Sequence, residues 1–142
     1  MAISNPPKVI IGYGRLTEEG FRFTPATGTC NLPANINDNA VGDVASFSVV
    51  DQYAEIILPA CVEITQFDHY GNAANGVNGR FTISYLGADD TWYDWVTDIP
   101  TVAAAWQSWN STGGKVTAKA IRWTMTTVDP GQGHVGEIRV KY

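Results

Sequence analysis

The sequence predicts a single all-β domain, and three observations support this. The chain has 142 residues, the usual length of one domain with one core. Short runs rich in β-branched and aromatic residues recur between clusters of Gly, Asn, Asp and Pro, which is the pattern of sandwiches and barrels. Helical periodicity is scarce, and no internal repeat or linker divides the chain.

Three strands are predicted in the middle of the chain. Tyr53–Leu58 and Val62–Phe67 have strand-like composition, and Pro59 marks a break between them because proline cannot donate to a strand ladder. Arg80–Tyr85 alternates strictly, with every second side chain apolar. One face of this third strand is therefore expected to meet a core.

Two further strands are predicted towards the carboxyl end. Ala120–Thr126 alternates and places Trp123 on the core side, and Val135–Tyr142 closes the chain with Arg139 on the outward side. Within the loops we expect one short helical turn at most, in Ile99–Trp109. The predicted loops are Pro25–Gly42, Tyr70–Gly79, Gly87–Thr91, Thr97–Gly114 and Val128–Gly133.

Charge and composition exclude several classes of partner. The net charge is −5, and the sequence has no run of Lys and Arg, so we expect no binding to nucleic acid. It has neither the roughly 18 consecutive apolar residues of a membrane helix nor a secretory signal, so we expect no membrane span and synthesis in the cytoplasm. Cys30 and Cys61 are expected to be two buried free thiols rather than a disulfide.

Several segments between Ala34 and Tyr142 occur in an order found in one known family. They are Ala34–Asp43, Val62–Phe67, Gly79–Tyr85, Asp89–Trp92, Ala118–Trp123 and Gly136–Tyr142. In this order and spacing the chain resembles the discoidin domains, also called coagulation factor type C domains, of the galactose-binding-like superfamily. The resemblance implies a jelly-roll β-sandwich of about eight antiparallel strands over residues 34–142. Residues 1–33 are then an amino-terminal extension with the first strands of the same globular domain.

The early loop of this segment carries a candidate cation site. Asn37, Asp38, Asn39 and Asp43 supply oxygen donors of the kind calcium prefers, although Asn and Asp are also ordinary turn formers. The resemblance implies a structural calcium between this loop and Glu137 on the last strand. The expected metal ligands are therefore Asp38, Asp43 and Glu137. The sequence departs from the family here, because the pair Asp38-Asn39 stands where Asp-Gly is usual.

A candidate ligand-binding surface is predicted around two tryptophans. Trp106 and Trp109 lie in a polar, predicted loop, where a helical turn would bring residues three apart together as an aromatic platform. Indole rings cover the apolar face of a sugar, and His69 and Arg80 are the polar groups expected to bind its hydroxyls. The alternatives are a contact surface for a partner protein, or a simply exposed His69. Trp92 and Trp123 are expected to be core residues.

No catalytic signature is present, so we expect a protein that is not an enzyme. The sequence lacks a Gly-x-Ser-x-Gly elbow and a His-Glu-x-x-His helix. The predicted function is a non-catalytic carbohydrate-binding, discoidin-like module on the surface of a virus or phage particle. The alternative is a structural or decoration protein whose jelly roll packs in a multimeric capsid or tail assembly. The expected partner is accordingly a glycan or a neighbouring virion protein, with a homo-oligomer as a further option.

Overall fold

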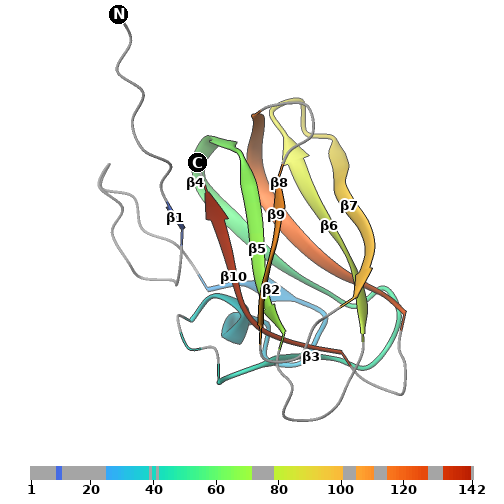
Figure 1. The fold of residues 1–142 in the computed structure, drawn as a ribbon. Coiled ribbons are helices and arrows are strands. Elements are labelled where there is room, and N and C mark those ends of the chain that lie inside the picture. Colours follow the sequence, from blue (N-terminus) through green and yellow to red (C-terminus); the bar gives the residue numbers. More distant parts are fainter. Residues whose placement is uncertain are drawn as a thin grey trace, which may run out of the picture.

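Two antiparallel β-sheets pack face to face in the computed structural model (Figure 1). The structure describes residues 9–10, 25–38, 40, 42–71, 79–100, 105–110, 115–127 and 133–141. Within these ranges it contains ten strands and one 3-10 helix, η1 (Pro33–Asn37), so the all-β prediction is confirmed.

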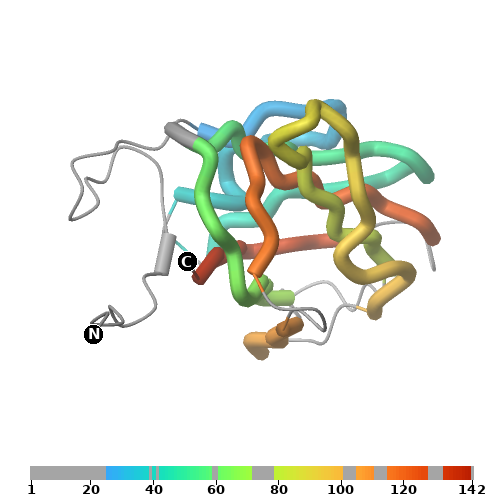
Figure 2. Tube along the Cα trace, turned by 90° about the horizontal axis from the view of Figure 1, so that it is seen from above, coloured from blue at the N-terminus to red at the C-terminus, as the bar shows by residue number. Residues whose placement is uncertain are grey.

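The two sheets combine strands that are far apart in the sequence. Sheet I has the order β1 (Val9–Ile10), β10 (Gly133–Lys141), β5 (Gln66–Gly71) and β8 (Ala105–Asn110), and β3 (Ala45–Phe47) also pairs with β10. Sheet II has the order β2 (Thr27–Gly28), β4 (Tyr53–Ile64), β9 (Val116–Thr127), β6 (Arg80–Gly87) and β7 (Trp92–Pro100). The view from above in Figure 2 shows the blue β2 segment beside β4, its partner in sheet II.

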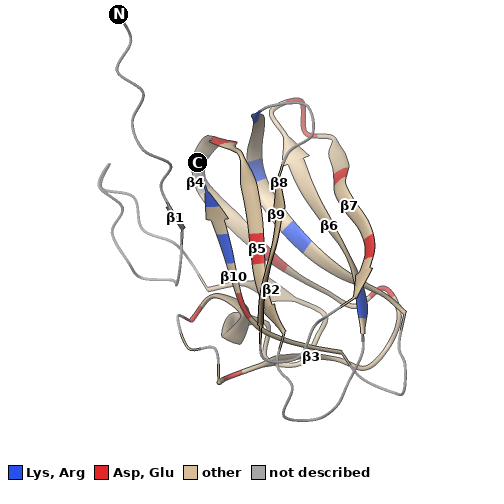
Figure 3. Cartoon of the chain, viewed as in Figure 1, with Lys and Arg blue, Asp and Glu red and all other residues tan. Residues whose placement is uncertain are grey.

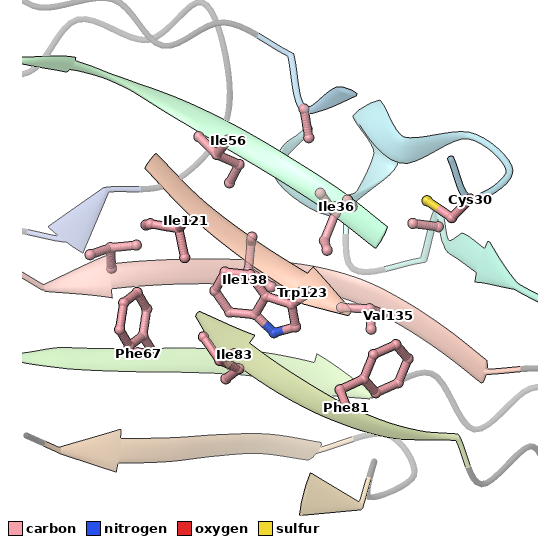
Figure 4. Close-up of a cluster of buried hydrophobic side chains, with 14 of the residues drawn as sticks. Cys30, Ile36, Ile56, Phe67, Phe81, Ile83, Ile121, Trp123, Val135 and Ile138 are labelled. Atoms are coloured by element: carbon pink, nitrogen blue, oxygen red, sulfur yellow. The ribbon is translucent and has the colours of Figure 1, made fainter. Parts of the chain in front are cut away.

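The core lies between the sheets, and strand alternation explains which side chains enter it. In the second half of β9 every second residue is apolar and fully buried, namely Ile121, Trp123 and Met125. Trp123 lies in the middle of the cluster in Figure 4, and its ring meets Phe67 of sheet I edge-on, with 5.7 Å between ring centroids. Trp123 therefore links the two sheets, as expected of a core residue.

The register between β5 and its neighbours determines which side chains of sheet I point into the core and which point outward. Phe67 pairs with Trp109, and Tyr70 pairs with Trp106, and side chains of paired residues lie on the same face. Because Phe67 belongs to the core, Trp109 points inward with it, whereas Trp106 and Tyr70 point outward.

Three of the sequence-based predictions about secondary structure are wrong. The expected strand Val62–Phe67 is divided at Thr65 between the end of β4 and the start of β5. The expected loop at Thr97–Gly114, with its helical turn, instead contains the end of β7 and the whole of β8, which pairs with β5 along its full length. The expected break at Pro59 lies inside the continuous strand β4. The pairing of β4 with β9 shifts between Ile57 and Val62, so the missing donor of Pro59 falls at an irregularity in the ladder.

The cysteines are free, as expected, but only one is buried. Burial raises the pKa of the Cys30 thiol to about 12, so this thiol stays protonated and unreactive. Cys61 is exposed, because it lies at the irregular middle of β4 rather than on a core position. The prediction of two buried thiols is therefore wrong for Cys61.

The amino-terminal segment contributes to the sandwich at two places. Val9 and Ile10 pair with Lys141 and Val140, which adds β1 to the edge of sheet I, and β2 pairs with β4. The boundary predicted between residues 33 and 34 remains a prediction. No helix among the described residues is long and apolar enough to cross a membrane.

Candidate functional site

The outward surface of sheet I carries a cluster of aromatic and charged side chains. We call this cluster the Trp106 face; it consists of Asp68, Tyr70, Trp106, Ser108 and Arg139. The guanidinium carbon of Arg139 lies 3.9 Å from the centroid of the Trp106 ring, a cation–π contact. The ring centroids of Tyr70 and Trp106 are 5.4 Å apart, and the two ring planes make an angle of 64°. Since Trp106 is on β8 and Arg139 on β10, this contact spans β5, which lies between them.

Polar groups line the same face. Asp68 lies on β5 in register with Arg139 on one side and Ser108 on the other, and only 8% of it is exposed. The Gln66 amide donates a hydrogen bond to the Asp68 carboxylate, and Lys141 Nζ donates to Gln66 Oε1 at 3.4 Å. An aromatic pair next to a carboxylate, an amide and two cations can bind a molecule that has both apolar faces and hydroxyl groups.

His69 and Trp109 lie on the opposite, inward face of sheet I. His69 is fully buried, its ring centroid is 4.7 Å from that of Trp109, and its Nε2 is 2.8 Å from Gln107 Oε1. Burial lowers the pKa of His69 to about 4, so the imidazole is neutral at pH 7. Trp109 packs against the core. Both residues therefore belong to the interior rather than to the Trp106 face.

The predicted platform of Trp106 and Trp109 is wrong for a geometric reason. Residues three apart share a face on a helix, but on a strand they point to opposite sides. Arg80 is not part of the Trp106 face either. It begins β6 in sheet II, where its Nε lies 3.0 Å from Asp98 Oδ1. Of the four predicted ligand-binding residues, only Trp106 faces outward on sheet I.

The predicted calcium ligands lie near η1. Burial raises the pKa of Asp38, and the neighbouring carboxylate of Asp43 raises it further. Asp38 Oδ1 accepts a hydrogen bond from the Ala40 amide at 2.8 Å, which lowers this pKa in part. Glu137 is 1% exposed on β10, which contacts η1. Asn39 lies outside the described residues.

Asp38 and Asp43 have the chemistry of a cation site, but the described residues do not form a complete set of ligands. Two neighbouring carboxylates repel each other, and a bound cation would relieve that repulsion. However, no group of three His, Cys, Asp or Glu residues within the described ranges is arranged to hold a metal ion. Calcium binding by Asp38, Asp43 and Glu137 therefore remains a proposal.

Chelation tests the calcium proposal directly. If a cation binds the native state alone, EDTA is expected to lower the melting temperature and added CaCl₂ to restore it. Asp38→Asn and Asp43→Asn are expected to remove this response, whereas Glu63→Gln, which changes an exposed carboxylate on β4, is expected to keep it. Differential scanning calorimetry gives the measurement. An unchanged melting temperature in EDTA would rule the site out.

The sequence does not single out four members of the Trp106 face: Asp68, Tyr70, Ser108 and Arg139. The alternation of the last strand did place Arg139 on the outward side, in agreement with the structure. The contact between Arg139 and Trp106, however, depends on the order of the strands in sheet I. That order joins residues more than thirty positions apart, and no local pattern indicates it.

A second cluster of arginine and aromatic side chains lies on sheet II. The guanidinium carbon of Arg122 is 4.5 Å from the Tyr53 ring centroid and 4.1 Å from that of Trp92. Glu55 Oε2 accepts hydrogen bonds from Arg122 Nε at 2.9 Å and from Nη2 at 2.6 Å. Trp92 is half-buried under Arg122 and outside the core cluster, so the prediction that it is a core residue is wrong.

Comparisons with known proteins place the fold. No family model matches the sequence, and no curated protein is similar to it in sequence at a significant level. Among solved structures, the CBM32 of AlyQ in complex with 4,5-unsaturated mannuronic acid has a TM-score of 0.71 and 17% identity, covering 84% of this chain and 95% of that one. A pectin binding carbohydrate binding module has a TM-score of 0.71 and 20% identity, covering 84% and 90%.

A third solved structure agrees with these two. The family 32 CBM from C. perfringens NanJ, in complex with galactose, has a TM-score of 0.70 and 14% identity, covering 84% of this chain and 93% of that one. These identities are low, so the likeness concerns the fold. The chain has the same jelly-roll β-sandwich fold as these CBM32 modules, in agreement with the jelly roll that the sequence resemblance implied.

Proposed function

We propose that this chain is a non-catalytic carbohydrate-binding module and that it binds its glycan on the Trp106 face. The observation that carries this proposal is the outward cluster of Trp106, Tyr70 and Arg139 beside Asp68. The similar structures lend support, because they include a module in complex with 4,5-unsaturated mannuronic acid, a pectin binding module and a module in complex with galactose.

The chemistry of the face suits a sugar. An indole or phenol ring covers the apolar C–H face of a pyranose and loses little side-chain entropy on binding, since each has only two rotatable side-chain bonds. The exposed Ser108 hydroxyl, which is in register with the buried Asp68, can donate and accept hydrogen bonds with sugar hydroxyls. Binding of this kind needs orientation and hydrogen bonds but no bond-making step.

Substitution of the aromatic pair tests the proposal. Trp106→Ala and Tyr70→Ala are each expected to weaken glycan binding by tenfold or more, because central aromatic contacts dominate such interfaces. The melting temperature is expected to change by only a few degrees, since both side chains lie outside the core. A glycan array identifies a ligand, and isothermal titration calorimetry measures its affinity.

Trp109 and Trp92 provide matched controls. Trp109→Ala alters the inward side of the same strand and is expected to reduce stability but to keep binding in the folded fraction. Trp92→Ala removes an arginine-stacked tryptophan on the other sheet and is expected to leave affinity unchanged. If Trp106→Ala binds as well as the wild type, the glycan site lies elsewhere.

The rival function, a structural or decoration protein, has one observation in its favour. Leu32, Val49, Val50 and Ile57 are large apolar side chains with 45–59% of their surface exposed, and packing against another copy would bury such side chains. Sedimentation velocity discriminates between the two functions. A monomer that binds glycans supports the module, whereas self-association without any glycan binding supports the structural protein.

The surface of a virus or phage particle is the setting that we propose for this module, following the sequence analysis. An antibody raised against the purified chain tests it. Detection of the chain in purified particles supports this setting, and its confinement to the lysate of the producing cells contradicts it.

A further inference from the structure

We infer that the Trp106 face selects glycans that carry a carboxylate group and that Arg139 binds this carboxylate. The inference rests on the proposed function and names the ligand class for the same site. It starts from the state of the Arg139 side chain. The guanidinium is stacked on Trp106, and its Nε is buried without a hydrogen-bond partner.

Arg139 has unmet hydrogen-bonding capacity. A guanidinium carries five N–H donors in a planar fork, and a buried donor without an acceptor is costly. Within the described part of the chain, the Arg139 guanidinium stacks on the ring of Trp106, and its buried Nε has no hydrogen-bond partner. This stacking holds the fork in one place without supplying an acceptor for its donors. A ligand carboxylate fits such a fork, since its two oxygens can accept two parallel hydrogen bonds.

The second arginine cluster shows what is missing. Arg122 is also stacked on aromatic rings, but Glu55 accepts hydrogen bonds from two of its nitrogens. The Arg139 cluster resembles the Arg122 cluster, except that its neighbouring carboxylate, Asp68, is not within ion-pair distance of the guanidinium. We infer that the bound glycan supplies a carboxylate at that distance.

The other basic side chains support this contrast. Arg80, Lys115 and Lys119 each form an ion pair, with Asp98, Glu63 and Asp90 respectively. Among the basic residues of the described ranges, Arg139 and Lys141 alone have no carboxylate within ion-pair distance. Both lie on the outward side of β10, two positions apart, where Figure 3 shows basic residues beside the acidic residue of β5.

Two acidic side chains lie on the same side of sheet I and must be considered. Asp68 accepts a hydrogen bond from Gln66 and is 8% exposed, and Glu137 is 1% exposed. Their burial keeps both carboxylates largely away from an incoming anion, whereas Arg139 and Lys141 are only half-buried. The charge that a ligand meets there is therefore positive, although the whole chain carries −5.

Matched acidic and neutral glycans test the inference on the wild-type chain. The probes are oligosaccharides of galacturonate, mannuronate, glucuronate and sialic acid, each compared with its own methyl ester. The free acid is expected to bind at least tenfold more tightly than the ester, and this preference is expected to shrink as salt is raised. Equal binding of acids and esters overturns the inference.

Variants of Arg139 assign the preference to this side chain. Arg139→Gln is expected to remove the difference between acid and ester, and Arg139→Lys is expected to keep only part of it because the planar fork is lost. Arg80→Gln, at an exposed arginine on the other sheet, is the matched control and is expected to retain the full preference. Retention of the preference in Arg139→Gln would also overturn the inference.

The remaining outcomes separate the two proposals. One outcome is that neutral glycans bind, that Trp106→Ala abolishes this binding and that Arg139→Gln leaves it unchanged. In that case the proposed function stands and the carboxylate preference fails. If no acidic or neutral glycan binds, the proposed function itself fails. Dextran sulfate binding as tightly as the uronates, with the same dependence on Arg139, would show a general anion site and would overturn the selection of carboxylates.

Discussion

Replacement of Trp123 by alanine is expected to lower the free energy of unfolding by about 3–5 kcal/mol. Trp123 is fully buried and is the largest such side chain among the described residues. It lies on β9 of sheet II and packs edge-on against Phe67 of sheet I, so its removal would leave a cavity between the sheets. Urea unfolding followed by circular dichroism measures the change, and a loss below about 1 kcal/mol would place Trp123 near the surface.

Two further substitutions show which property of Trp123 matters. Trp92→Ala, which removes a half-buried tryptophan outside the core, is expected to cost clearly less. Trp123→Phe keeps an aromatic ring and removes the indole Nε1, which is buried without a hydrogen-bond partner. Its cost is therefore expected to be well below that of Trp123→Ala. Equal losses for Phe and Ala would indicate a special role for the indole rather than for its volume.

Strict alternation explains why most strands could be predicted. Apolar residues alternate with polar ones at Phe81–Tyr85 of β6, Ile121–Met125 of β9 and Ile138–Val140 of β10, because one face of each of these segments meets the core. Trp123 is therefore assigned to the core by sequence alone. β8 has no such signal: its outward side carries Trp106 and its inward side carries the polar Gln107. This segment is a strand because it pairs with β5, and β5 is distant in the sequence, so no local pattern predicts the pairing.

The candidate site was predicted less well, for reasons of topology. The sequence indicates Trp106 as a contact residue because this tryptophan lies among polar residues. Its partners Tyr70 and Arg139 come from strands that are adjacent only in the folded sheet. His69 was expected at the ligand site, but the register of β5 with β8 turns it inward beside Trp109. A shift of one residue in that register would exchange the two faces, and composition does not determine the register.

Acidification is expected to destabilise the fold through His69. Burial lowers the pKa of His69 in the folded state to about 4, against an ordinary value of 6.5. Below pH 6.5 the unfolded chain binds a proton at this histidine that the folded chain does not bind, so unfolding becomes more favourable as the pH falls. The contribution is fully present above pH 6.5 and is lost progressively down to about pH 4. The loss amounts to about 3 kcal/mol at 1.36 kcal/mol per pKa unit.

Urea unfolding at pH 7 and at pH 4.5 measures this effect. His69→Gln removes the titrating group and is expected to be less stable than the wild type at pH 7, because the Gln107 contact and the packing on Trp109 change. Its further loss between pH 7 and 4.5 is expected to be smaller than that of the wild type. His134→Gln is the control. Burial also lowers the pKa of His134, but less than that of His69. Removal of His134 is therefore expected to reduce the pH dependence only slightly. A wild-type pH dependence that persists in His69→Gln would show that other groups cause the acid sensitivity.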